Sequence, residues 1–247
     1  MAEQPEAGRD SGPEVRFVVF GARLTGELTV SRARHRSTGL PAGLGVVSGN
    51  VEDLRALHRV APLGTMYAES AAMAAVMQAE AASYVAGRPE AGKPADYLPN
   101  TVGIVAALAE AHGPNAVVSD LNAHFLRQRA VWEHEVFRHD PIDPRSLVQI
   151  FESAEGAVIF LSTRGMRTLG APDIAVPFVT ADWRDAAVAV VERFILMAAQ
   201  GIAPQPGRRL TAPGLPDGIA VTEGMDDYHP YFDNRHVTLQ QPSGTRH

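Results

Sequence analysis

Residues 156–200 read GAVIFLSTRGMRTLGAPDIAVPFVTADWRDAAVAVVERFILMAAQ, and this stretch decides the fold class. Gly156–Leu161 and Ile174–Phe178 are runs of β-branched and aromatic residues, which predicts two strands. Residues 182–200 repeat apolar side chains at helical spacing, so they predict a long helix with a wide apolar face. Two short strands followed by a helix that packs against a sheet indicate an α+β fold.

The rest of the chain predicts the same mixture of short elements. We expect further strands over residues 15–20, 27–30, 44–47, 115–118, 218–221 and 236–240. We expect helices over residues 50–58, 65–86, 100–112, 120–139 and 146–152, with a Pro/Gly loop over 87–99. The strands are short, which favours a mixed or mainly antiparallel sheet packed against several helices. One α+β domain over residues 15–241 follows, with disordered tails at 1–14 and 242–247.

Charge and hydropathy limit the class of partner. The 247 residues carry 28 Asp+Glu against 22 Lys+Arg, a net charge of −6, so a broad nucleic-acid surface is not expected. The first 14 residues contain no apolar segment of a secretory signal, and no apolar stretch is long enough to span a membrane. We therefore expect no membrane partner and a cytoplasmic location. The many alanines and arginines resemble the composition of proteins from GC-rich bacteria.

Two residue counts exclude several kinds of chemistry. The chain has no cysteine, which excludes a disulfide, a thiolate nucleophile and a Cys-ligated metal. Lysine occurs once, at Lys93, within the predicted Pro/Gly loop, which is a poor setting for a desolvated amine. A pyridoxal phosphate enzyme is therefore not expected, whereas a divalent metal held by His, Asp or Glu stays open.

The predicted helix over residues 120–139 contains the first group of candidate residues. His134 and Glu135 resemble the start of a zinc-protease helix, but the next histidine, His139, comes five residues after His134. On an α-helix that spacing turns the two imidazoles about 140° apart, so they cannot bind one metal together. Glu135 and His139 do share a face, which leaves a Glu/His pair as one alternative and a solvated charged face as the other.

The second group lies near the C-terminus, in a segment rich in imidazoles and carboxylates. These side chains suit Zn, Mn, Fe or Ni, and they are Asp226, Asp227, His229, Asp233 and His236. Their spacing matches no defined metal site. The alternative interpretation is a surface turn held by Asx hydrogen bonds.

The C-terminal part also has a recognisable order of motifs. A strand leads to Gly165-Met-Arg-Thr-Leu-Gly170-Ala-Pro-Asp-Ile-Ala-Val176, then a long helix and a closing strand. Over about residues 100–240 this order resembles the bacterial domain-of-unknown-function family numbered 4261. Leu169 stands where that family usually has phenylalanine, and Asp173 where it usually has glutamate. The resemblance implies a compact α+β fold and supplies no catalytic residues.

Two functions remain open at this point. The absence of a complete catalytic motif favours a non-enzymatic binding or protein-interaction domain, whose partner would be another protein. The alternative is a metal-dependent hydrolase that uses the Asp226–His236 segment with help from His134, Glu135 or His139. The sequence leaves the oligomeric state open.

Overall fold

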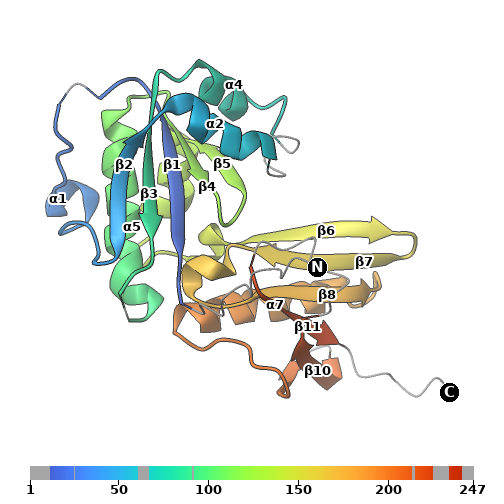
Figure 1. The fold of residues 1–247 in the computed structure, drawn as a ribbon. Coiled ribbons are helices and arrows are strands. Elements are labelled where there is room, and N and C mark those ends of the chain that lie inside the picture. The colour runs from blue at the N-terminus through green and yellow to red at the C-terminus, as the bar shows by residue number, and fades with distance from the viewer. Residues whose placement is uncertain are drawn as a thin grey trace, which may run out of the picture.

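The strands form two sheets (Figure 1). The computed structural model describes residues 12–24, 26–60, 67–90, 92–212, 215–224 and 234–240. The first sheet has the order β2-β3-β1-β4-β5 and is antiparallel throughout. Its strands are β1 (Val15–Gly21), β2 (Leu44–Gly49), β3 (Ala81–Gly87), β4 (Val117–Asp120) and β5 (Phe125–Gln128). The fold class is therefore α+β, as the sequence predicts.

The second sheet has the order β6-β7-β8-β11-β10-β9. Only the pairing of β8 with β11 is parallel, and every other pairing among its described strands is antiparallel. Its strands are β6 (Gln149–Glu155), β7 (Val158–Arg164), β8 (Asp173–Val179), β9 (Arg209–Ala212), β10 (Leu215–Glu223) and β11 (His236–Gln240).

The helices cover both sheets (Figure 1). The α-helices are α1 (Arg32–His35), α2 (Val51–Val60), α4 (Ala71–Gln78), α5 (Pro94–Ala111), α6 (Arg129–Trp132) and α7 (Arg184–Ala199). A π-helical turn, η1 (Glu133–Phe137), continues α6. Two 3-10 turns, η2 (Pro144–Leu147) and η3 (Met166–Leu169), lie on either side of the β6–β7 hairpin.

Strand β1 is apolar on both faces because the first sheet is covered on both sides. Phe17 and Val19 belong to the cluster that contains α5, whereas Val18 and Phe20 pack with residues of α2 and α4. Alternate side chains of a strand point to opposite faces, so a strand covered twice needs a continuous apolar run.

Helix α5 packs on one face of the first sheet and against α7, and it links the cores of the two sheets. Its buried side chains belong to one hydrophobic cluster that also contains Phe17 of β1, Ile174 of β8 and Phe194 of α7. The phenol of Tyr97 on α5 donates a hydrogen bond of 2.7 Å to the carbonyl of Thr168 in η3. The core is thus continuous from one sheet to the other.

The helix predicted over residues 65–86 is wrong for most of its length. Residues 61–66 lie outside the described part, α4 covers Ala71–Gln78, and the chain then becomes strand β3. Ala81–Gly87 pairs with β1 along its whole length, and Ala82–Gly87 also pairs with β2. Two ladders of hydrogen bonds in the middle of a sheet outweigh the helix propensity of alanine, which is a weak preference.

The loop predicted over residues 87–99 is also too long. Helix α5 begins at Pro94, where the missing N–H costs nothing, and Asp96 accepts a hydrogen bond of 2.8 Å from the Lys93 N–H. Pro99 lies inside the helix, a position that proline usually avoids. Because of this proline, the start of the helix was predicted at Asn100.

The helix predicted over residues 120–139 is wrong for its first half. There the chain makes a turn after β4 and continues as strand β5, and the helical part begins only with α6. The Oδ1 atom of Asp120 accepts hydrogen bonds of 3.0 Å from the N–H groups of Asn122 and Ala123, as a helix cap would. His124 then adopts a left-handed conformation, with φ of 56°, and the chain reverses into β5. The same Asx bonding serves a turn as well as a helix start, so the sequence alone did not separate them.

The remaining elements follow the sequence more closely. The strands expected near residues 15–20, 44–47, 156–161, 174–178, 218–221 and 236–240 and the helices near 50–58 and 182–200 are confirmed. Residues 27–30 form no strand, residues 115–118 form one only from Val117, and the helix expected over 146–152 is largely strand β6. Of the expected tails, residues 1–11 and 242–247 lie outside the described part.

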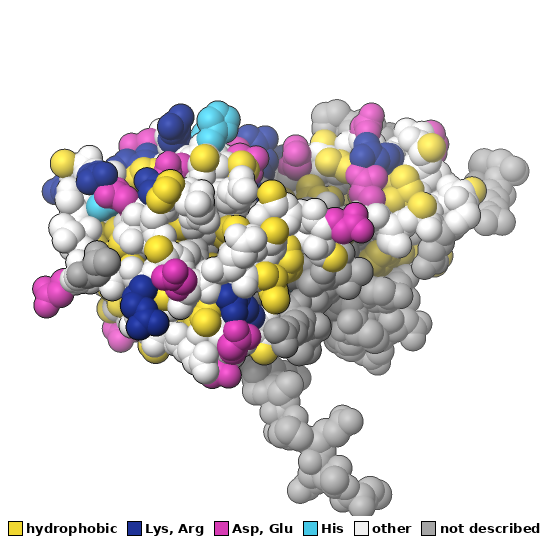
Figure 2. Space-filling view, turned by 90° about the horizontal axis from the view of Figure 1, so that it is seen from above, with side chains coloured by type: hydrophobic (Ala, Val, Ile, Leu, Met, Phe, Trp, Pro, Cys, Tyr) yellow, Lys and Arg dark blue, Asp and Glu magenta, His cyan; other side chains and the backbone are white. Residues whose placement is uncertain are grey.

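The face of the molecule seen in Figure 2 is mixed in charge. Arginine and acidic side chains alternate with apolar ones on the face seen in Figure 2, and neither sign gathers into one patch there. Across the described residues, no helix combines the length and apolar character needed to cross a membrane.

Candidate ligand-binding cavity

A cavity of about 620 Å³ opens where α1, α5, α7 and the loop over residues 139–144 meet. Its wall is mainly aliphatic and proline side chains, with a few polar ones: Pro94, Ala95, Leu98, Pro99, Val102, Pro141, Ile142, Pro144, Leu196, Ala199, Gln200, Arg32, Arg36, His139 and Asp140. A concave apolar site of this volume between helices is typical of small-molecule pockets.

The α5 wall of the cavity follows from helical spacing. Ala95, Leu98, Pro99 and Val102 are separated by three, one and three residues, so they lie along one face of the helix. Leu196 and Ala199 line the opposite wall, on α7, the helix that packs against the second sheet. The cavity therefore depends on both halves of the fold.

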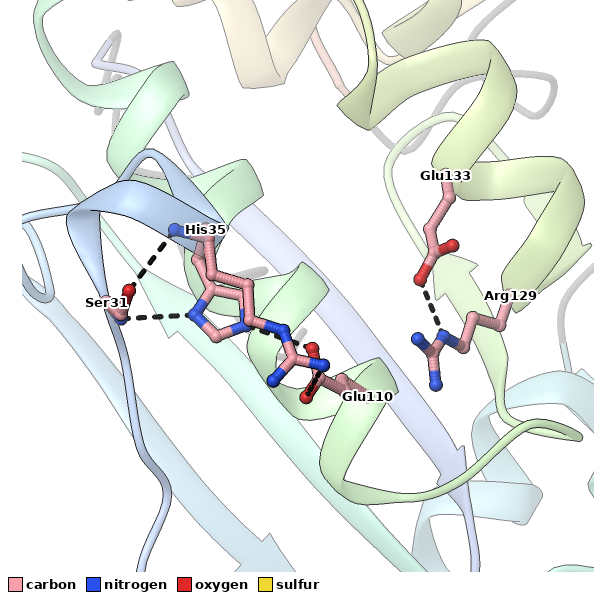
Figure 3. Close-up of polar contacts among 6 residues, drawn as sticks. Ser31, His35, Glu110, Arg129 and Glu133 are labelled. Carbon is pink, nitrogen blue, oxygen red and sulfur yellow. Dashed lines mark hydrogen bonds and ion pairs between the residues drawn. The ribbon is translucent and has the colours of Figure 1, made fainter.

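A different face of α5 holds α1 in place (Figure 3). Glu110 accepts an ion pair of 2.6 Å from Arg34, and its other carboxylate oxygen lies 3.3 Å from His35 Nε2. His35 Nδ1 accepts a hydrogen bond of 3.1 Å from the N–H of Ser31. Ser31 in turn caps α1, because its Oγ accepts a hydrogen bond of 3.2 Å from the Arg34 N–H.

Two further residues on that face of α5 complete the attachment. The amide oxygen of Asn100 accepts a hydrogen bond of 2.8 Å from the N–H of Thr38. Gly103 lets the backbones approach, since a Cβ built there would lie 2.2 Å from the carbonyl oxygen of His35. Asn100, Gly103 and Glu110 are spaced by three and seven residues, so one helix face positions the whole α1 segment.

Arg36 fixes the loop on the other side of the cavity. Its Nη1 donates a hydrogen bond of 3.0 Å to the carbonyl of His139, and its guanidinium lies 4.5 Å from the centre of the Phe137 ring. The same nitrogen lies 3.9 Å from a carboxylate oxygen of Asp140. The donors of Arg36 are thus used in contacts that attach α1 to the loop over residues 139–144.

Arg32 is placed differently. It lines the cavity and is exposed, and within the described residues it has neither an ion pair nor a hydrogen bond from its side chain. The alternating arginines Arg32, Arg34 and Arg36 do not indicate this difference, because such a run also occurs in solvated basic segments. The spacing of Asn100, Gly103 and Glu110 on one helix face was the available signal of a docked segment.

The candidate residues near 134–139 are separated by the structure. His139 lies at the cavity, whereas His134 and Glu135 are exposed on η1, and Glu135 forms an ion pair of 2.7 Å with Arg127. The predicted sharing of one helix face by Glu135 and His139 is wrong, since the regular helix ends before His139. A π-helical turn and a loop replace the α-helix on which that spacing was based.

Of the five C-terminal candidates, Asp226, Asp227, His229 and Asp233 lie outside the described residues. His236 is buried in β11, in register with Asp173 of β8. Asp173 accepts hydrogen bonds of 3.0 Å from Thr163 Oγ1 and 3.0 Å from Asn234 Nδ2, which links β7, β8 and the start of β11. In the part of the chain that the structure describes, no three His, Asp or Glu side chains gather into a metal site.

A buried carboxyl between the sheets also escaped the sequence analysis. Asp120 is fully buried, which raises its pKa to about 6 although two N–H groups bind its Oδ1. The neighbouring Asn122 donates hydrogen bonds of 2.6 Å to the carbonyl of Glu14 and 2.9 Å to Thr168 Oγ1. No described cavity reaches Asp120, so we assign this turn to the joining of the sheets.

One Ser–His pair resembles an activated nucleophile but cannot meet a substrate. Ser83 Oγ lies 2.9 Å from His112 Nε2, and His112 Nδ1 lies 2.7 Å from the carbonyl of Ala22. That carbonyl needs a proton on Nδ1, so Nε2 accepts the serine proton, and burial lowers the pKa of His112. Ser83 is 0% exposed in the interior strand β3, which makes the pair a structural contact.

Comparisons of the chain with protein-family profiles, curated proteins and solved structures find no match. The site must therefore be interpreted from its own geometry.

Proposed function

We propose that this chain is a non-enzymatic binding domain that takes a small, largely apolar molecule into the cavity between α5 and α7. The observation that carries the proposal is the cavity of about 620 Å³ with aliphatic walls from both halves of the fold. Burying the apolar part of a ligand there would contribute roughly 25 cal/mol for each Å² removed from water.

The chemistry around the cavity supports binding rather than catalysis. His139 is the titratable side chain at the site, together with the carboxyl of Asp140, and the two adjoin each other in one loop. General acid–base catalysis needs groups that converge on a reacting atom and are held there by other contacts. The Asp140 side chain is instead 82% exposed.

Variants that fill the cavity test the proposal. Ala95 and Ala199 line the cavity, so Ala95→Trp and Ala199→Trp should occupy it. Ala189 is exposed on α7 away from the cavity, and Ala189→Trp is the matched control. The probe is N-phenyl-1-naphthylamine, an uncharged dye whose fluorescence rises in apolar surroundings.

We expect one saturable binding site in the parent chain and in Ala189→Trp, and at least tenfold weaker binding in both cavity variants. Loss of most of a buried aromatic ring accounts for a change of that size. The proposal is wrong if the dye shows no saturable binding, or if the cavity variants bind as the control does.

We further propose that residues 100–240 are related to the bacterial domain-of-unknown-function family numbered 4261 and that the protein acts in the cytoplasm. The order of motifs from Gly165 to Val176 supports the first part. Fractionation of the native bacterium tests the location, which recovery in the membrane or secreted fraction would contradict.

A further inference from the structure

We propose that the ligand of this cavity is an amphipathic monoanion, an apolar chain or ring with one carboxylate or phosphate, whose head group pairs with Arg32. This inference rests on the proposed function and adds the ligand's charge and orientation. It follows from the charges at the cavity and from how they are already used.

The charged side chains that line the cavity are two arginines and one aspartate, besides His139. Arg36 and Asp140 form a pair at 3.9 Å, so these two charges largely offset each other. Arg32 is then the charge left over. A guanidinium beside an apolar cavity favours an anion and disfavours a cation.

Arg32 is also available, because no described carboxylate or carbonyl takes its donors. Its neighbour Arg34 differs in this respect, being paired with Glu110 at 2.6 Å. A guanidinium offers five N–H donors in a planar fork that matches a carboxylate or phosphate. A ligand head group can therefore bind Arg32 without breaking an existing contact.

The position of Arg32 is fixed by the rest of α1. His35, one helical turn away, is buried against Glu110, and Ser31 caps the helix immediately before Arg32. Holding the backbone of Arg32 in advance reduces the ordering cost that a ligand would otherwise meet. The apolar part of the ligand then extends along Leu98 and Val102 of α5.

The experiment compares three probes with the same ten-carbon chain: decanoate, decanol and decylammonium. Each is titrated against the full chain by calorimetry and by displacement of N-phenyl-1-naphthylamine, at low and high salt. The variants are Arg32→Gln, Arg32→Lys and the control Arg138→Gln. Arg138 is an exposed arginine next to His139 in the chain, and it does not line the cavity.

We expect decanoate to bind about tenfold more tightly than decanol, and decylammonium to bind most weakly. Arg32→Gln should remove the preference for decanoate and leave decanol unchanged, Arg32→Lys should keep part of it, and Arg138→Gln should alter neither. High salt should weaken decanoate alone. Octanoate, titrated as a further probe, should bind more weakly than decanoate by about fourfold for each of the two missing methylenes.

The outcomes separate the two proposals. Equal binding of decanoate and decanol, or an equal loss of both in Arg32→Gln, overturns the anionic head group while the cavity remains a binding site. Tightest binding of decylammonium overturns it as well. Failure of every probe to bind contradicts the proposed function itself.

Discussion

Asp120 lies in surroundings that disfavour the charged form of its side chain. Its carboxyl is fully buried between the sheets, and its Oδ2 atom has no hydrogen-bond partner in the described structure. A buried group without a partner favours its neutral form. The pKa of about 6 therefore expresses a cost of keeping the charge inside the fold.

That cost predicts how stability depends on pH. The unfolded carboxyl has a pKa near 3.9, so between about pH 4 and pH 6 the folded state binds more protons than the unfolded state. The contribution of Asp120 to stability is thus present at low pH and lost as the pH rises to 6. Its size above pH 6 is at most about 3 kcal/mol.

Asp120→Asn should remove this loss. The free energy of unfolding of the variant minus that of the parent chain should be larger at pH 7 than at pH 4, by up to about 3 kcal/mol. The variant is therefore stabilised relative to the parent as the pH rises. Urea unfolding at both pH values measures the difference, with Asp53→Asn on the surface of α2 as the control. A difference that is the same at both pH values would show that Asp120 is ionised normally.

At the scale of elements, α1 depends on a glycine of its neighbour. Gly103→Ala should lower the free energy of unfolding by about 1–3 kcal/mol, because its Cβ would overlap the His35 carbonyl. In an open helix the same change would stabilise by about 1 kcal/mol. Urea unfolding decides the sign, and decanoate binding should weaken in parallel as α1 is displaced.

Glu110→Gln serves as the comparison for that variant. It removes the charge that pairs with Arg34 and His35 without adding an atom to the interface. We expect a smaller loss than for Gly103→Ala, since ion pairs at the surface contribute little. A larger loss would mean that charge, rather than close approach, holds α1.

Elements whose own residues carry a clear apolar pattern were predictable, and elements fixed by distant partners were not. The α7 pattern specifies a helix by itself, and β1 specifies a strand by its β-branched run. In contrast, Ala81–Gly87 becomes a strand only because β1 and β2 lie on both sides of it. Local propensity cannot report a contact made with residues 60 positions away.

The candidate site shows the same division. The sequence identified His139 as a candidate residue, and His139 does line the cavity. The metal site proposed for it, however, assumed a regular α-helix up to His139, and the π-helical turn over Glu133–Phe137 replaces that helix. The aliphatic wall was not identified, because Leu98, Ile142 and Leu196 come from three separate segments. A pocket whose wall is shared by several elements produces no regular pattern in the sequence of any single element.

At the scale of the whole molecule, the continuous core predicts how the chain unfolds. Residues of both sheets share one hydrophobic cluster, to which α5 also contributes. We expect a single calorimetric transition whose van't Hoff and calorimetric enthalpies agree. Two resolved transitions would show instead that the sheets unfold as separate domains.

Helix α5 finally determines where this protein can tolerate substitution. Most of its side chains are buried, one face receives α1, and another borders the cavity. A helix in contact on nearly every side offers few positions where a new side chain has room. Amino-acid diversity in a library of this chain should therefore survive on the exposed edge strand β2 and be depleted along α5.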